Sequence, residues 1–379
     1  GSEMCIRDRG SATRSDIAIT DPDFKYPSLW KSNIAADYKF GDGWVATVEL
    51  LYSKDINAIY HDNIGLYRTE QFVNDGGAGN ARPYYNGYYS DREGNQKAAN
   101  HVVMLRNTSK GHSLYTTFQL QKNFVDGILK GLYLNGSYSF GQSRGVTDGT
   151  SSVATSAWKY RAALDGNAEE VGYTAGSFDG RLLLSASYTA NWSKYAATSF
   201  GLIYQRYRPF RYSYCYNGDA NGDSQFSNDL MYIPANFDEV KDHLLPGDFD
   251  SQEDAWKAMN AFIEQDPYLS KHRGEYAERN GAVAPFANQL DLSVSHDIKI
   301  YQKNGRSHTL RFSFNIANFL NLLNRNWGVV QTTVLGNQQY QFLTIPKGQG
   351  PSAANNYTLK YTMAKDLDET FKDNLNDVS

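Results

Sequence analysis

Segments of about ten residues in which apolar and polar side chains alternate recur along most of this chain, which is the pattern of half-exposed strands. One segment alternates strictly over residues 309–316, with Leu310, Phe312, Phe314 and Ile316 set against Thr309, Arg311, Ser313 and Asn315. Successive side chains of a strand point to opposite faces of a sheet, so each segment predicts one apolar and one polar face. No run of 18 apolar residues exists, which excludes a protein built from membrane-spanning helices.

The alternation predicts eight strands whose connections are short and long in turn. The strands are expected at Asn33–Phe40, Trp44–Ser53, His112–Phe124, Gly131–Gly141, Gly180–Trp192, Ala196–Tyr207, Gln289–Ile300 and His308–Asn318. The long connections cover residues 54–111, 142–179 and 208–288. The short turns are Gly41–Gly43, the stretch around Asp126 and Gly127, Ser193–Tyr195 and Tyr301–Ser307.

All short turns therefore fall at one end of the strands and all long loops at the other. Outer-membrane barrels have this asymmetry, with short periplasmic turns and long extracellular loops. Compact soluble domains seldom contain several loops of this length. We therefore expect an all-β fold, namely part of an antiparallel transmembrane β-barrel, in preference to a soluble β-domain.

Charges and aromatic residues sort by face in the predicted strands. The inward phase carries Asp37, Lys39, Glu49, Arg181, Asp291 and Arg311, and the outward phase carries Lys122 and His296. The chain contains 28 Tyr, 19 Phe and 6 Trp, and four of these rings lie near strand ends on the outward phase: Trp44, Tyr52, Trp192 and Tyr204. They fit an interfacial aromatic girdle, although ordinary cross-strand packing explains each ring equally well. A net charge of -4 argues against a nucleic-acid partner.

One helix is expected inside the long loop 208–288, near residues 251–265. Ser251 is a suitable N-cap, and Asp254 follows three residues later. Trp256, Met259 and Phe262 then recur at helical spacing and form an apolar face. This face either packs onto the loop itself or forms a docking surface for a surface lipoprotein.

The same long loop contains a calcium-like pattern. Asp219, Asn221 and Asp223 stand at positions 1, 3 and 5 of a calcium loop, and Gln225 would offer its backbone carbonyl at position 7. The pattern departs at position 6, where Ser224 replaces glycine, and its last carboxylate, Asp229, comes one residue early. The alternative is an Asx-rich turn without a metal. Ca²⁺ is the only cofactor that the sequence suggests.

Two aromatic clusters in the loops are candidate ligand contacts, because flat rings beside Arg or Asn suit sugar rings or peptides. They comprise Arg82, Tyr84, Tyr85 and Tyr88 in one loop and Trp158 and Tyr160 in another. The alternative is that these tyrosines simply order a surface loop. No enzyme is expected: Ser143 lies in a G-x-S-x-G pattern, but no helical periodicity follows it, and the His residues show no metal spacing.

Several further stretches carry a family resemblance. They are Ser28–Asn33, Asp42–Thr47, Lys54–Ala58, Asn107–Gly111, Asn228–Pro234, Tyr268–Glu275 and Asn318–Asn324. They resemble the barrel of large TonB-dependent receptors of Bacteroidota-type bacteria, of the Oar-like and SusC/RagA-like kind, over nearly all of residues 16–379. The resemblance implies a 22-stranded barrel in the outer membrane of a Gram-negative bacterium, with a plug in its lumen.

The resemblance also implies import of a nutrient such as a glycan or peptide, energised through TonB, with a surface lipoprotein as a further partner. Oar-like relatives leave open a non-transporting adhesin or surface-assembly protein. We expect residues 11–379 to be a C-terminal part of such a barrel, incomplete at both ends and lacking the plug. The decapeptide Gly1–Gly10 resembles a translated sequencing-adapter scar and is excluded from the fold.

Overall fold

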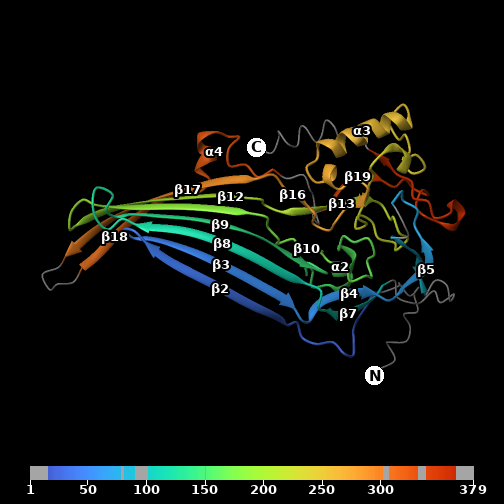
Figure 1. The fold of residues 1–379 in the computed structure, drawn as a ribbon, viewed down its shortest axis with the longest axis horizontal. Coiled ribbons are helices and arrows are strands. Elements are labelled where there is room, and N and C mark those ends of the chain that lie inside the picture. The colour runs from blue at the N-terminus through green and yellow to red at the C-terminus, as the bar shows by residue number, and fades with distance from the viewer. Residues whose placement is uncertain are drawn as a thin grey trace, which may run out of the picture.

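The computed structural model describes residues 16–77, 81–89, 101–149, 151–301, 307–331 and 339–363. A long antiparallel sheet forms one part of the molecule, and the long loops fold together into a second part at one end of that sheet (Figure 1). We call this second part the loop body; it comprises the described residues of 56–111, 146–179, 208–286 and 339–363. No helix among the described residues is long and apolar enough to cross a membrane.

The sheet contains all eight predicted strands in sequence order. They are β2 (Leu29–Phe40), β3 (Trp44–Asp55), β8 (His112–Asn123), β9 (Leu132–Gly145), β11 (Arg181–Asn191), β12 (Ala196–Tyr207), β17 (Ala287–Tyr301) and β18 (Ser307–Ile316). Each strand pairs antiparallel with the next, which confirms the predicted all-β meander. A short strand, β10 (Gly172–Tyr173), pairs antiparallel with the loop-side end of β9. Ser143 lies within β9, so the strand-to-helix turn that a hydrolase nucleophile needs is missing there.

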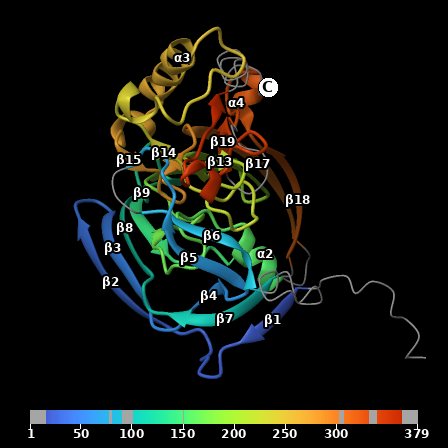
Figure 2. The same cartoon turned by 90° about the vertical axis from the view of Figure 1, so that its right-hand side faces the viewer.

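Tight turns close the sheet at the end away from the loop body (Figure 1). Gly41 and Gly43, both at positive φ, make the β2–β3 turn, and Gly127 and Gly131 do the same between β8 and β9. Glycine adopts this backbone region without a steric penalty. Residues 302–306 of the predicted turn Tyr301–Ser307 lie outside the described residues. Seen from the loop end, the long strands follow an arc around the loop body (Figure 2).

One face of the sheet is apolar from edge to edge, because directly opposed residues share a face. In one row Tyr188, Phe200, Val294 and Phe314 stand opposite one another across β11, β12, β17 and β18. Many large apolar side chains of this face are exposed, and we call the following exposed side chains the apolar belt: Ile34, Tyr38, Val48, Leu50, Phe118, Leu120, Tyr138, Phe140, Leu184, Tyr188, Phe200, Leu202, Ile298, Leu310, Phe312 and Phe314.

The other face is polar and carries hydrogen bonds between side chains of neighbouring strands. These link Asn33 with Glu49, Asp37 with Thr47, Thr117 with Ser139, Gln119 with Asn135, Thr189 with Ser199, Gln205 with Gln289, and Asp297 with Arg311. This face looks towards the loop body, since Tyr115 stacks on Phe178 with ring centroids 4.5 Å apart.

The registers also correct the predicted distribution of charge. Lys54, opposite Trp30 and His112, is a charge on the outward phase just beyond its predicted strand. Within the predicted strands His112, Arg206 and His308 share this phase with Lys122 and His296, because they stand opposite Lys54, Leu182 and Ile300 respectively. All three lie at strand ends, so the middle of the apolar belt still carries no Arg or Lys among the described residues. Lys122 lies over the Trp44 and Phe124 rings at 5.1 and 4.8 Å from their centroids.

The loop body contains the remaining elements. They are β4 (Ala58–Asn63), β5 (Leu66–Phe72), β6 (Pro83–Tyr88), β7 (Val102–Thr108), α2 (Ala154–Lys159), β13 (Arg211–Asn217), β14 (Tyr232–Ile233), η1 (Phe237–Glu239), α3 (Gln252–Gln265), η2 (Leu269–Lys271), β15 (Glu275–Tyr276), β16 (Ala282–Val283), β19 (Gln339–Thr344), η3 (Ala353–Asn355) and β20 (Thr362–Met363). β1 (Ile17–Thr20) pairs parallel with β7, and α4 (Phe319–Leu323) follows β18.

The buried hydrophobic core lies in the loop body. Tyr214, Tyr216, Met231, Phe262 and Phe342 are among its members, which come from stretches far apart in the chain. β13 forms its centre, because it pairs parallel with β19 and antiparallel with β16.

The predicted loop helix is confirmed as α3. Ser251 accepts a hydrogen bond from the Asp254 backbone N–H and caps the helix, as expected from the sequence. Met259, Phe262 and Ile263 on its apolar face are buried in the core of the loop body. The interpretation that this face packs onto the loop is therefore the one that the structure supports.

Candidate metal centre

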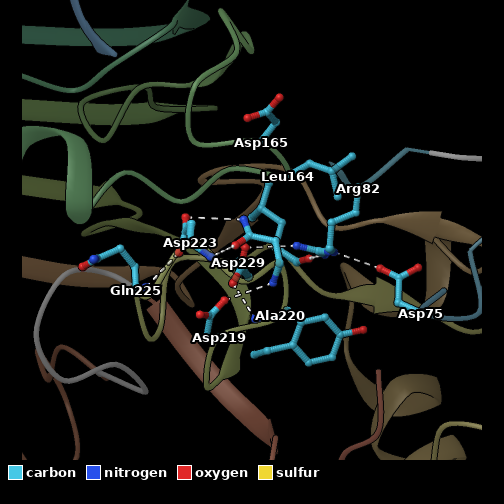
Figure 3. Close-up of polar contacts among 12 residues, drawn as sticks. Asp75, Arg82, Leu164, Asp165, Asp219, Ala220, Asp223, Gln225 and Asp229 are labelled. Carbon is cyan, nitrogen blue, oxygen red and sulfur yellow. Dashed lines mark hydrogen bonds and ion pairs between the residues drawn. The ribbon is translucent and has the colours of Figure 1, made fainter. Parts of the chain in front are cut away.

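Three carboxylates converge just after β13, within the loop body. Asp219, Asp223 and Asp229 each place an oxygen within 4.8 Å of the others, and Asp223 and Asp229 are buried. Figure 3 shows the three side chains directed towards one another, with Arg82 alongside. The acidic side chains of residues 219–229 thus converge on one point.

The backbone of this stretch is organised by Asp219. Its carboxylate accepts hydrogen bonds from the N–H groups of Asn221, Gly222 and Ser224, at 3.2, 2.6 and 2.8 Å. Gly222 has a φ of +82°, and a Cβ there would collide with the Tyr85 carbonyl. Glycine is therefore required at position 222. The sharp turn of this loop thus falls at position 222, whereas a calcium loop would have it two residues later, at Ser224.

Asp223 and Asp229 are held by different partners. Asp223 accepts from the Gln225 backbone N–H at 2.8 Å and from the Asn221 amide at 3.4 Å. Asp229 accepts from the Ala220 N–H at 2.8 Å and from the Arg82 guanidinium at 3.2 Å. Asp229 is thus tied both to the acidic turn and to a cation from a different loop.

Arg82 is fully buried between Asp75 and Asp229. Its Nε lies 3.0 Å from Asp75, its Nη1 lies 3.2 Å from Asp229, and its Nη2 donates to the Leu230 carbonyl. The rings of Tyr216 and Tyr276 flank the guanidinium at 5.6 and 5.8 Å. Burial alone lowers the pKa of Arg82, but the two carboxylates more than offset this and keep it charged.

One guanidinium cannot neutralise all of these acids. Burial raises the pKa of Asp229 to about 7, even though Arg82 opposes that shift. Burial also raises the pKa of Asp223 well above its usual range, and the neighbouring Asp229 and Asp219 add to the increase. Burial raises the pKa of Asp219 as well, against the backbone N–H groups that it accepts from. Near neutral pH the cluster therefore favours a bound proton or a bound cation.

The oxygen set suits a hard cation, because Ca²⁺ takes carboxylate and carbonyl oxygens as ligands. Three of the sequence candidates, Asp219, Asn221 and Asp223, lie in this cluster, and Gln225 is buried beside it. Asp229 also lies in this cluster but is not among the sequence candidates, because the twelve-residue calcium loop has its last carboxylate one position later. Its acidic side chain at the eleventh position was the available signal.

The aromatic ligand candidates have a different location from the one expected. Arg82, Tyr84, Tyr85, Tyr88 and Trp158 are all buried inside the loop body, and of the six candidates only Tyr160 is exposed. Tyr85 donates to Asp165 at 2.7 Å, and Trp158 donates to Asn167 at 2.9 Å. These five side chains present little surface to a ligand, and their burial favours the alternative that they order the loops against one another.

No protein-family model matches this chain, and no curated protein matches it. Among solved structures it is similar to a mutant of the ferric enterobactin receptor of Pseudomonas aeruginosa, with a TM-score of 0.31 and 8% sequence identity. The similarity covers 78% of this chain and 31% of the receptor, so the chain spans about a third of the length of that protein.

Proposed function

We propose that this chain is part of an outer-membrane β-barrel receptor that imports a nutrient, energised through TonB. The observation that carries the membrane part of this proposal is the apolar belt. Monomeric soluble proteins seldom expose contiguous apolar patches larger than a few hundred Å², whereas the belt crosses all eight strands. Hydrocarbon chains of lipid are the solvent that suits such a surface.

The dimensions of the sheet agree with a bilayer. β2, β3, β8 and β12 have 12 residues each. At about 3.3 Å per residue and a tilt of about 40°, such a strand rises roughly 30 Å along the membrane normal, which exceeds the apolar band of about 25 Å in outer-membrane barrels. The residues left over at each end then lie in the interfaces.

The strand ends have the side chains that suit those interfaces. At the turn end, Trp44 and Phe40 stack at 6.3 Å, and Lys122 covers the Trp44 ring from the outward phase. Trp192 is exposed in the β11–β12 turn and donates to Thr198 at 2.7 Å. Aromatic rings and snorkelling lysines are typical of the membrane–water boundary.

The importing role rests on the sequence resemblance to TonB-dependent receptors. In this proposal the polar face lines a wet lumen, the loop body lies at the extracellular end, and the nutrient is a glycan or a peptide. TonB and a surface lipoprotein are the proposed protein partners. The competing role, a non-transporting adhesin or assembly protein, would use the same sheet without energy from TonB.

We also propose Ca²⁺ as the occupant of the acidic cluster. Three carboxylates of raised pKa supply the charge, and Asn221 supplies an additional oxygen. A bound ion would hold the turn 219–229 against the loop that carries Arg82, and it would thereby stiffen the loop body.

Spin labels on adjacent residues of one strand test the membrane placement. The labels are attached at Phe118→Cys, on the apolar belt, and at Thr117→Cys, on the polar face, in the full chain reconstituted in phospholipid bilayers. Membrane placement predicts that oxygen, which concentrates in lipid, relaxes the label at 118 and that a water-soluble nickel complex relaxes the label at 117. Equal access of the nickel complex to both labels would overturn the proposal.

Uptake separates an importer from an adhesin. Cells that express the whole receptor gene are given fluorophore-labelled oligosaccharides and peptides, with TonB intact or deleted. Import that requires TonB supports the proposal. Surface binding that is the same in both strains, without internalised fluorophore, supports the adhesin instead.

A further inference from the structure

A pocket of about 460 Å³ opens beside the loop-side ends of β12 and β17. Six of its lining residues are aromatic or amide side chains: Tyr204, Phe286, Asn288, Asn326, Trp327 and Gln331. Its volume falls within the 300–1,000 Å³ that is usual for small-molecule sites. None of these residues belongs to the acidic cluster.

The floor of the pocket belongs to the outward phase of the sheet. Tyr204 stands opposite Leu290 and two residues after Leu202 of the apolar belt. Its hydroxyl donates to the Asn288 side chain at 2.8 Å. The pocket therefore begins where the apolar belt ends, at the rim nearest the loop body.

One wall is an aromatic ring flanked by cations. Phe286 is exposed, and the guanidinium groups of Arg206 and Arg208 lie 4.5 and 4.1 Å from its ring centroid. Arg206 itself is on the outward phase, opposite Leu182. Arg208 is paired with Asp179 at 3.9 Å and donates to the Ala284 carbonyl at 2.8 Å, whereas Arg206 places a positive charge at the border of the pocket.

Another lining residue is a tryptophan on a hydrogen-bonded segment. Trp327 is 52% exposed, and the segment around it is held by asparagines whose amides donate to backbone carbonyls: Asn318 to Gly328 at 2.9 Å, and Asn321 to Arg325 at 2.9 Å and to Trp327 at 3.2 Å. Gly328 has a φ of +68°, and a Cβ there would collide with the Asn318 side chain. The ring is therefore positioned before any ligand arrives.

Exposed rings on a stiff frame, beside amide groups, suit the rings of a sugar. The ring faces offer rigid apolar area at little cost in conformational entropy. The amides of Asn288, Asn326 and Gln331 both donate and accept, as sugar hydroxyls require.

We infer that this pocket binds sugar rings of a lipid-anchored glycan in the outer leaflet. The inference rests on the proposed membrane placement, which puts the rim of the apolar belt at the height of the lipid headgroups. Arg206 would face a phosphate group of such a glycolipid. A free oligosaccharide has the same ring chemistry, so the experiment separates these two sources.

The test compares two probes on the full chain in phospholipid nanodiscs. One set of nanodiscs includes lipopolysaccharide, and the other receives the soluble core oligosaccharide released from it. Bound lipopolysaccharide is counted by native mass spectrometry, and the oligosaccharide is titrated calorimetrically. The variants are Trp327→Ala, Trp327→Phe and Asn288→Ala, and the control is Trp192→Ala, which removes an exposed tryptophan at the opposite end of the sheet.

We expect the wild type and Trp192→Ala to retain lipopolysaccharide, and Trp327→Ala and Asn288→Ala to bind it at least tenfold more weakly, with Trp327→Phe in between. Binding of the soluble oligosaccharide alone, with the same variant pattern, would overturn the lipid-anchored source and keep the sugar site. Binding of either probe that no variant weakens would overturn the site. Failure of the spin-label test would instead remove the membrane placement, independently of this variant pattern.

Discussion

The sheet and the loop body of this molecule are built on opposite principles. In the sheet, large apolar side chains point away from the loop body and stay exposed, while the polar side chains bond to one another across strands. In the loop body the apolar side chains are buried together, and even a charged guanidinium is enclosed. The difference teaches that the loop body has a core of its own, whereas the sheet relies on its surroundings to cover the apolar belt.

The largest effect is expected from Arg82→Met, because it leaves Asp75 and Asp229 buried without their cation. Breaking a buried ion pair from one side costs about 3–5 kcal/mol, which corresponds to roughly a 10²–10⁴-fold increase in local opening. Hydrogen exchange read peptide by peptide measures it. The expected acceleration covers the loop body and leaves the amides of β2, β3, β8 and β9 unchanged.

Arg68→Met is the matched control. Arg68 also pairs with an aspartate, Asp165 at 3.1 Å, but its side chain is 54% exposed. Exposed pairs contribute about 0–1 kcal/mol, so exchange should barely change. Equal acceleration in the sheet and in the loop body by Arg82→Met would show that the two regions unfold as one unit, and the comparison would then fail.

The second prediction tests whether lipid or water covers the apolar belt of the sheet. Phe200→Arg places a charge in the middle of the apolar belt, and we expect a loss of about 2–4 kcal/mol in the free energy of folding into a bilayer. Ser199→Arg, one residue away on the polar face, is the control and should cost much less. If water covered both faces, a surface substitution at either site would stay within about 0.5 kcal/mol, and the measured difference would vanish.

The sheet was predictable from the sequence because its determinants are local. Period-two alternation and turn glycines specify each strand, and the bounds of β12 agree with the prediction at both ends. The same alternation also puts His112, Arg206 and His308 on the outward phase, and all three lie at strand ends, where charge is compatible with the apolar belt.

The loop body was not predictable in the same way, because its contacts join distant stretches. Arg82 and Asp229 are 147 positions apart, and no local sequence pattern predicts that they form an ion pair. The sequence therefore suggested Tyr84, Tyr85 and Tyr88 as ligand contacts, although these rings are buried. α3 is the exception, since its cap and its apolar face are both local signals.

The third prediction concerns pH and calcium in the loop body. Asp223 and Asp229 have pKa values that folding raises, so the folded state holds protons that the unfolded state has released. Stability without calcium is therefore greatest at low pH and falls as pH rises from about 4, the unfolded value, to about 7 and beyond. We expect peptides covering 212–233 to open at least tenfold more often at pH 8 than at pH 5 in a chelator, after correction for intrinsic exchange.

Adding calcium at pH 8 should restore protection, because the ion replaces the lost protons. Asp223→Asn should remove the calcium effect and weaken the pH dependence, to which Asp229 still contributes. Asp238→Asn, on an exposed side chain of the same region, should change neither. Protection that ignores calcium while the pH dependence persists would show that the cluster binds protons only.

The smallest effect is expected from the cap of α3. Ser251→Ala removes the hydroxyl that accepts the Asp254 N–H, at a cost of about 1 kcal/mol, or roughly fivefold faster exchange in residues 252–265. Ser251→Asp keeps an acceptor at the cap and should exchange like the wild type. Because α3 is bound to the loop body through Met259 and Phe262, the acceleration should extend into that core and stop at the sheet. An effect that also reached β12 and β17 would mean that the sheet depends on the loop body for its stability.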